Sequence, residues 1–395
     1  MRLQWYKEYM KQLTAGILAL AFFLPPLSGA FAAETERAFP VMVSTADLQA
    51  KYIAAGQGGE KVKVLLMPGH EPSYGGAELN GLREREVAVD IANKIARELS
   101  LDPRLEVTVA RDQLSWSPAL SSYFEEEWKS IQKFVKEKKR IFNRALKNGD
   151  IAARDFEPAH NTAATDVALR LYGITKWANE EGYDLAVHIH LNDTGAQNHQ
   201  GFAVYVPDKE FGNAEAARPL GEAIAFELNR FNASSTLPIE NYGVVEDQSL
   251  IALGAFNTAE FPSVLVEYAY IYEPKIKNME ARDIVLSDMA HQTYRGIEKA
   301  LGATVTGSNT RALPYAWTGT TKANVSSPEA YALQVALKSL GFFPPKGQLL
   351  IGCPLSGVMD TCTVNALNAY QSSKGWTPTG AIGPMTKAAL KAAGF

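Results

Sequence analysis

The sequence predicts an α/β fold in which a mostly parallel sheet is flanked by helices. Two observations support this fold class. Short apolar segments, typical of buried strands, alternate with longer segments whose apolar residues recur at helical spacing. In addition, the 395 residues are 46% hydrophobic and 21% charged, the composition of a globular chain with enough apolar surface for more than one core.

The first 32 residues have the features of a signal peptide. A basic start is followed by an apolar run over residues 13–27 and by Ala30-Phe31-Ala32, which fits a small-x-small cleavage site. A membrane anchor is the alternative, but the run is short for a span and two prolines interrupt it. We therefore expect an exported protein, periplasmic or secreted to the cell wall, with no stable membrane span after cleavage.

The alternating elements follow in order from residue 45. A short helix is expected over residues 45–53, with Thr45 as its N-cap. The expected strands are 62–66, 105–111, 185–191, 201–206 and 264–270, and the expected helices are 84–99, 166–181, 214–231 and 284–301. Strands that alternate with helices in this way are typical of parallel sheets.

Four polar residues stand where these elements begin or end: His70, Glu84, His190 and Glu267. Strand ends of an α/β sheet are where such folds place their sites. Two imidazoles and one carboxylate form a known catalytic zinc set, and a second carboxylate nearby can carry a proton. Whether the four side chains meet depends on the fold.

The motifs around these residues resemble one enzyme family. The chain has Gly69-His70, then Glu84-Arg85, then His188-Ile189-His190-Leu191-Asn192, and finally Pro262-Ser263-Val264-Leu265-Val266-Glu267. In this order, over about residues 60–300, they resemble the zinc-dependent N-acetylmuramoyl-L-alanine amidases. The resemblance implies that His70, Glu84 and His190 bind Zn²⁺. It also implies that Glu267 acts first as general base and then as general acid.

Several neighbouring residues allow more than one interpretation. His188 stands where the family usually has Ser, and its role stays open, with a neighbouring ligand or a group that supports the ligands as one option. Glu86 lies about 200° around the helix from Glu84, so both cannot face one metal ion, and we choose Glu84. Three further candidates are expected to contact the substrate: Asn192, Asn257 and Tyr268. For Arg111 we expect a salt bridge at the end of the sheet.

Residues 119–149 interrupt the alternation and look like a helical insertion relative to the family. Their apolar residues fall near helical spacing, so they predict an amphipathic helix or a pair of helices. We favour a packed structural hairpin. The alternative is a lid over the site, because some family members regulate themselves in that way.

The C-terminal part follows residues 304–327, which are rich in small and polar residues and are expected to form a linker. Residues 328–395 resemble the three-helix peptidoglycan-binding domain of cell-wall hydrolases, through Ala332-Leu333-Gln334 and Gly380-Ala381-Ile382-Gly383 among others. In an exported protein, Cys353 and Cys362 are expected to form a local disulfide, although two reduced thiols stay open as the alternative.

Together these features predict an exported peptidoglycan amidase with a catalytic domain over residues 33–303. It would cut the amide bond between N-acetylmuramic acid and L-alanine. The alternatives are a zinc peptidase that cuts within stem peptides and a non-catalytic, wall-binding regulatory protein. Peptidoglycan is the expected partner, and an activator protein is a further candidate. A net charge of −4 gives no indication of nucleic-acid binding.

Overall fold

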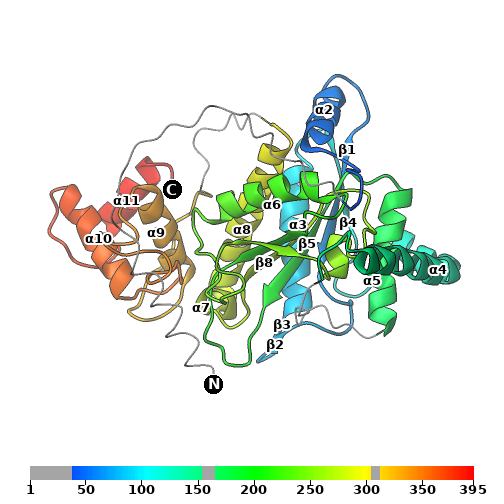
Figure 1. Cartoon of the computed structure of the whole chain (residues 1–395). Coiled ribbons are helices and arrows are strands. Elements are labelled where there is room, and N and C mark those ends of the chain that lie inside the picture. Colours follow the sequence, from blue (N-terminus) through cyan, green and yellow to red (C-terminus); the bar gives the residue numbers. More distant parts are fainter. Residues whose placement is uncertain (1–37, 154–164, 304–311) are drawn as a thin grey trace, which may run out of the picture. The chain divides into compact units, whose positions relative to one another are not determined.

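A six-stranded sheet forms the centre of the larger domain (Figure 1). Its order is β4-β1-β5-β8-β6-β7, and the first four of these strands are parallel. The strands are β1 Val62–Pro68, β4 Leu105–Val109, β5 Leu185–Asn192, β6 Ala203–Pro207, β7 Val244–Asp247 and β8 Ser263–Tyr270. Only the β6–β8 pair is antiparallel within this sheet. The predicted mostly parallel sheet is therefore confirmed.

The computed structural model describes residues 38–153, 165–303 and 312–395. The predicted signal peptide, residues 1–32, lies outside these ranges, as does the first part of the predicted linker. Within the described ranges, no helix is both long and apolar enough to cross a membrane.

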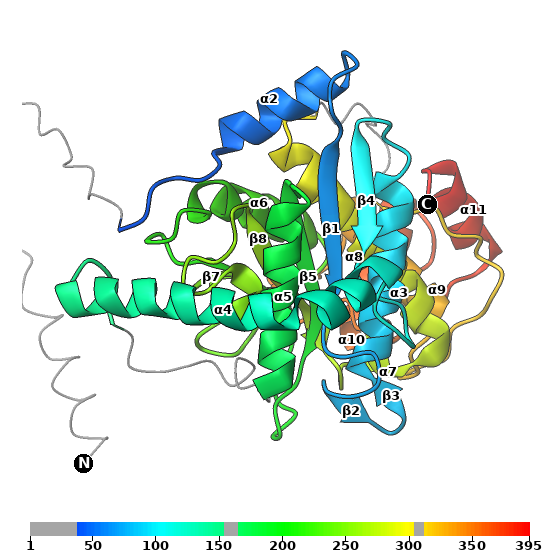
Figure 2. The same cartoon turned by 90° about the vertical axis from the view of Figure 1, so that its right-hand side faces the viewer.

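Helices cover both faces of the sheet. One face packs against α3 Glu84–Leu99, α6 Ala214–Leu228 and α8 Met279–Ala300. The other face packs against α5 Thr165–Glu180. Figure 2 shows α4 Pro118–Asn148 running across α5. A 3₁₀ turn, η2 Ile251–Leu253, packs beside the strands on the α5 side.

Strict alternation along the strands sorts side chains between the two faces. In β5, Val187, Ile189 and Leu191 join the core formed with α3, α6 and α8, while Ala186 packs on the α5 side. In β8, Val264 and Val266 join the first core. The even-numbered residues of β5, which include His188 and His190, therefore share the face opposite to this core.

The smaller elements differ from the prediction in their details. Helix α2 Thr45–Ala55 begins after Ser44, whose side chain accepts a hydrogen bond from the Asp47 amide, so the predicted Thr45 cap is wrong by one residue. The sequence analysis missed β7, the hairpin of β2 Glu78–Leu79 and β3 Leu82–Arg83, and α7 Pro274–Lys277. These segments are too short to show a recognisable periodicity.

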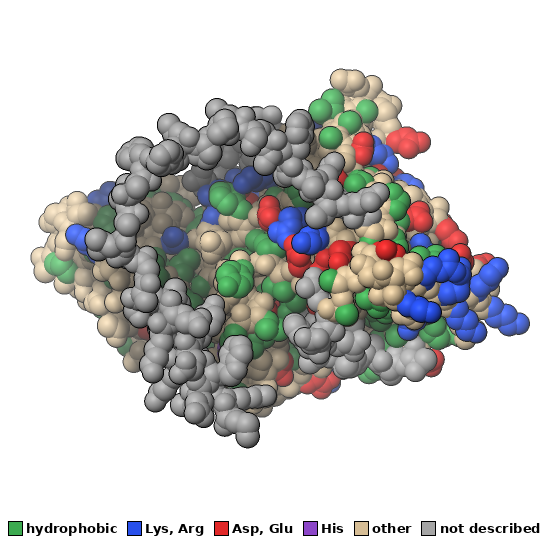
Figure 3. Space-filling model, in the orientation of Figure 1, with side chains coloured by type: hydrophobic (Ala, Val, Ile, Leu, Met, Phe, Trp, Pro, Cys, Tyr) green, Lys and Arg blue, Asp and Glu red, His purple; other side chains and the backbone are tan. Residues whose placement is uncertain are grey.

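The predicted helical insertion is one continuous helix, α4, and the predicted hairpin is wrong. Ser117 caps its start, and Gly149 ends it in the left-handed conformation. Its buried face includes Ile131, Val135 and Phe142, which pack against α5, η2 and Phe211. Lys and Arg side chains are prominent on the opposite, exposed side (Figure 3). The alternative role of this helix, as a lid over the site, stays a hypothesis.

The C-terminal part contains α9 Pro328–Ser339, α10 Thr361–Ser373 and α11 Pro384–Ala392, as predicted. Cys353 and Cys362 form a disulfide. The described part of the predicted linker, residues 312–327, contacts the C-terminal end of the chain: Trp317 is buried, and its indole N–H donates to the Phe395 carbonyl. From α9, the Tyr331 hydroxyl donates to the buried Asp288 carboxylate of α8.

Candidate active site

His70 lies in a turn immediately after β1, and the backbone of this turn is unusual. Its φ of +68° lies in the left-handed region, which a non-glycine residue adopts at some energetic cost. The buried guanidinium of Arg111 donates to the carbonyls of Pro68, Gly69 and Arg85. Burial lowers the pKa of Arg111 to about 10. The predicted salt bridge of Arg111 is therefore wrong, since its partners are backbone carbonyls that hold the His70 turn.

Two glycines make room for the imidazoles. A Cβ atom at Gly69 would lie 2.3 Å from the His190 ring, far inside van der Waals contact. Gly76 has a φ of +80°, and a Cβ there would lie 2.7 Å from the His70 ring. Both positions therefore require glycine so that the rings of His70 and His190 can approach, with their centroids 4.8 Å apart.

Glu84 begins α3 and points into the space between the two histidines. Its Oε1 lies 2.8 Å from His70 Nε2 and 3.1 Å from His190 Nδ1. The amides of Leu191 and Ala77 also donate to this carboxylate. Burial alone would raise the pKa of Glu84, but the charges of the two histidines and the hydrogen bond with His190 outweigh it and hold the pKa below its usual range.

The three side chains suit a metal ion. One ligand atom from each of His70, Glu84 and His190 can be chosen so that all lie within 4.8 Å of one another. His70 Nε2 is buried and makes no hydrogen bond despite its short distance to Glu84. A converging set of two imidazoles and one carboxylate, with a polar atom left unsatisfied, fits a zinc-type ion. Glu86 instead lies at the surface and pairs with Arg83.

Glu267 lies beside this cluster on the neighbouring strand. It is the register partner of His190 in the parallel β5–β8 pair, so the two side chains share the same face. Glu267 is 4% exposed, and its Oε2 has no hydrogen-bond partner among the described residues. Burial, together with the negative charges of Glu84 and Glu240, raises its pKa well above the ordinary value of 4.5.

A buried polar network borders the cluster, and the sequence analysis did not find it. Glu240 is 1% exposed and accepts hydrogen bonds from Asn192, Tyr205 and Tyr270. Asn192, predicted to contact substrate, thus has its amide group held at the end of β5. Glu240 lies in a loop with no periodic pattern, which explains why no sequence signal indicated it.

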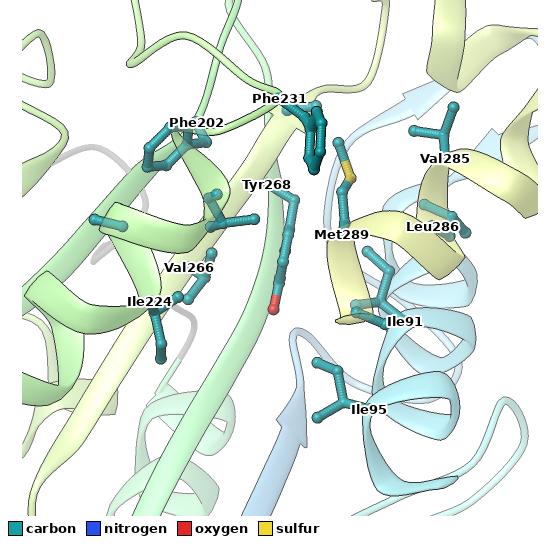
Figure 4. Close-up of a cluster of buried hydrophobic side chains, with 14 of the residues drawn as sticks. Ile91, Ile95, Phe202, Ile224, Phe231, Val266, Tyr268, Val285, Leu286 and Met289 are labelled. Atoms are coloured by element: carbon teal, nitrogen blue, oxygen red, sulfur yellow. The ribbon is translucent and has the colours of Figure 1, made fainter. Parts of the chain in front are cut away.

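The two other residues predicted to contact substrate lie away from the histidines. Tyr268 is fully buried in the core on the opposite face of the sheet (Figure 4), and its hydroxyl is hydrogen-bonded to that of Thr293. Asn257 is also buried, and its side-chain oxygen accepts a hydrogen bond from the Gly212 amide. Neither residue lines the pocket beside the histidines.

That pocket opens next to His70 and His190. Its lining includes the apolar side chains of Met67, Trp116, Leu171, Leu250, Ile251 and Leu265. Glu71 and Arg170 also line it and form an ion pair of 2.7 Å, and Glu71 accepts a hydrogen bond from the Trp116 indole. His188 lies in the same pocket, where burial and the neighbouring His190 lower its pKa to about 3. It does not belong to the metal-binding cluster.

Comparison with known proteins identifies the two parts of the chain. Residues 64–299 match the family model of N-acetylmuramoyl-L-alanine amidases, and residues 326–390 match that of a peptidoglycan-binding domain. No curated protein matches the sequence.

Among solved structures, the chain is similar to three amidases over about the same region. The amidase Ami1 of Mycobacterium smegmatis is 17% identical, with 62% of this chain and 98% of that chain covered and a TM-score of 0.42. AmiC2 of Nostoc punctiforme is 20% identical, with 62% and 99% covered and a TM-score of 0.38. An amidase of Clostridium difficile 630 is 17% identical, with 62% and 100% covered and a TM-score of 0.39.

These structural similarities are weak, so the assignment rests on the family match, which spans more than half of the chain. That match includes the cluster of His70, Glu84 and His190, together with Glu267. The chain therefore belongs to the N-acetylmuramoyl-L-alanine amidase family and is a peptidoglycan amidase that carries a C-terminal peptidoglycan-binding domain.

Proposed function

We propose that this amidase uses a zinc ion, bound by His70, Glu84 and His190, to cut the amide bond between N-acetylmuramic acid and L-alanine. The observation that carries the proposal is that the ligand atoms of the three residues converge, while the buried Nε2 of His70 makes no hydrogen bond. Imidazole and carboxylate ligands together favour zinc in hydrolytic sites. A bound zinc ion would supply a Lewis acid for the scissile carbonyl and lower the pKa of the attacking water.

Glu267 is proposed to carry the proton in this reaction. Its carboxylate accepts a proton from the attacking water and then gives it to the nitrogen of the leaving L-alanine, so that the amine departs neutral. Two observations support this role: its position beside His190 on the same face of the sheet, and its buried, unpaired Oε2. The raised pKa also favours a group that must hold a proton between two steps.

The cell-wall hydrolase domains imply that the enzyme acts outside the cytoplasm. We propose that residues 1–32 are a signal peptide and that the mature enzyme is periplasmic or released to the wall. In this proposal, residues 33–303 form the catalytic domain, 304–327 the linker and 328–395 the binding domain. The family matches at 64–299 and 326–390 support this division into a catalytic and a binding domain.

The test is digestion of purified muropeptides by the mature chain, with products identified by mass. Free stem peptide and peptide-free glycan are expected, with activity lost in a chelator and restored by zinc. Cleavage within the stem peptide would instead identify a peptidase. If zinc binds but nothing is cut, deletion of α4 or addition of an activator protein should release activity; a preparation that stays inactive would contradict the proposal.

A further inference from the structure

His188 lies two residues before the proposed ligand His190 on β5, in a second row of side chains on the same face of the sheet. His188 is the register partner of Met67 on β1 and of Leu265 on β8, just as His190 is the partner of Glu267. Same-face residues of a strand are about 7 Å apart, because each residue rises about 3.3–3.4 Å. The row of Met67, His188 and Leu265 therefore lies within the reach of a small substrate group beside the scissile bond.

This row lines a pocket whose other walls are mainly apolar. Leu171 comes from α5 and Trp116 from the segment before α4, while Leu250, Ile251 and Ala252 come from η2 and the residue before it. Ile251 also packs against α4, so the position of this wall is fixed by the long helix. The pocket suits a compact, largely apolar terminal group of a substrate.

His188 is the unusual residue of this pocket. Its side chain is 7% exposed, yet no hydrogen bond or ion pair joins it to any residue that the structure describes. The other described histidines all have polar neighbours, such as Thr236 for His199 and Glu98 for His291. Because His188 lines the pocket, its imidazole can hydrogen-bond to a polar group that the substrate places there.

We infer that this pocket binds the acetamido group of the N-acetylmuramoyl residue and that His188 hydrogen-bonds its amide. An uncharged imidazole offers one N–H donor and one nitrogen acceptor, which match the carbonyl and N–H of an acetamido group. The terminal methyl then contacts the apolar walls. The acetamido and lactyl groups stand on neighbouring carbons of the sugar ring, so both can reach this part of the site. The inference rests on the proposed function.

The charged groups of the stem peptide fit the pocket less well. A carboxylate among Leu265, Ile251 and Leu171 would be desolvated without a matching charge. Arg170, the cation at this pocket, is already paired with Glu71, and it also donates to the Tyr74 hydroxyl. The observations therefore favour the sugar side of the scissile bond over the peptide side.

The test compares two soluble substrates, an N-acetylmuramoyl peptide and its N-deacetylated counterpart, in the wild-type enzyme and in His188→Leu. The wild type is expected to prefer the acetylated substrate. In the variant, kcat/KM for the acetylated substrate should fall about 10- to 100-fold, the usual result of removing a buried hydrogen-bond partner. For the deacetylated substrate it should change less than about threefold, with zinc content and thermal unfolding unchanged.

A second variant keeps His188 and fills the pocket. Ala252→Leu is expected to reduce selectively the activity on the acetylated substrate. If His188→Leu and Ala252→Leu instead lower kcat/KM equally for the acetylated and the deacetylated substrate, the acetamido assignment is wrong. Loss of zinc from His188→Leu would show that His188 supports the metal site, and unchanged kinetics would show that it contacts no substrate.

Binding without turnover separates this inference from the proposed function. Saturation-transfer NMR with N-acetylmuramic acid and with muramic acid should show a contact of the acetyl methyl in the wild type that is lost in both variants. This signal does not depend on amide cleavage. Equal signals in the wild type and both variants would overturn the inference even if the enzyme proved to be an amidase, and a selective signal would support it even if cleavage failed.

Discussion

The two faces of the central sheet are built from alternate residues of the same strands, yet they differ in how their polar groups are satisfied. On the face toward α6 and α8, Val266 and Tyr268 pack into a continuous apolar core (Figure 4), which also includes Ile189. The hydroxyl of Tyr268 is hydrogen-bonded to that of Thr293 there. On the opposite face, His188 lines the pocket, and the buried Oε2 of Glu267 has no hydrogen-bond partner among the described residues. One face therefore provides stability, while the other keeps polar groups available for chemistry.

The sharpest way to test this contrast is Glu267→Gln. The amide keeps the size of the side chain but cannot accept the proton, so kcat should fall about 10²- to 10⁴-fold. Zinc content should stay the same, because Glu267 is not one of the three clustered ligands. The measurement is hydrolysis of muropeptides together with metal analysis; substantial turnover by the variant would remove Glu267 from the mechanism.

The matching change on the other face is Ile189→Ala, between His188 and His190 on the same strand. Ile189 is fully buried, so truncation should lower the free energy of unfolding by about 2–5 kcal/mol. The activity per folded molecule should change little, because the side chain points away from the site. Denaturant unfolding and active-site titration check this prediction; a large loss of kcat in the folded fraction would show that the two faces are not separable.

A smaller effect is expected on the stability of the metal-free enzyme. Since burial raises the pKa of Glu267, the folded chain holds this proton more tightly than the unfolded chain. Stability from this group is fully present below the ordinary pKa of 4.5 and is lost as the pH rises through the raised folded pKa. Metal-free Glu267→Gln should therefore be more stable than the wild type at neutral pH, by about 1–3 kcal/mol.

Thermal unfolding of both metal-free proteins across pH 4–8 measures this difference. The buried Asp288, with a pKa raised to about 6, contributes a loss in the same direction but is present in both proteins and cancels. The stability of metal-free Glu267→Gln relative to the wild type should increase with pH. A difference that is constant or shrinks with rising pH would mean that the Glu267 carboxyl is not destabilised by burial.

The smallest effect is expected for Glu86→Ala, the matched control for Glu84→Ala. Glu86 pairs at the surface with Arg83, and exposed pairs of this kind contribute about 0–1 kcal/mol. Its removal should leave zinc binding and activity intact, whereas Glu84→Ala should lose the metal ion. Metal analysis of both variants decides the assignment; zinc loss on replacement of Glu86 alone would reverse it.

Sequence reasoning located the longer strands, the three clustered residues and the neighbouring Glu267, because motif order and strand ends are local properties. The same alternation could have excluded Tyr268: if Glu267 faces the site, the next residue on the strand must face away. The hydrogen-bond partners of Arg111 and of Glu240 could not be predicted from the sequence, because they are contacts between residues far apart in the chain. The hairpin expected within 119–149 failed because nothing in the periodicity marks a turn, and none exists.

Arg111 has a consequence for how metal ions enter and leave the site. Its guanidinium holds the carbonyls around the His70 turn through contacts that need no ion. A ligand set fixed in advance loses little conformational freedom when its ion arrives. Zinc should therefore exchange for another divalent ion, such as cobalt, while the chain stays folded. A cobalt-substituted enzyme prepared in this way would carry a coloured reporter at the point where the amide bond is cut.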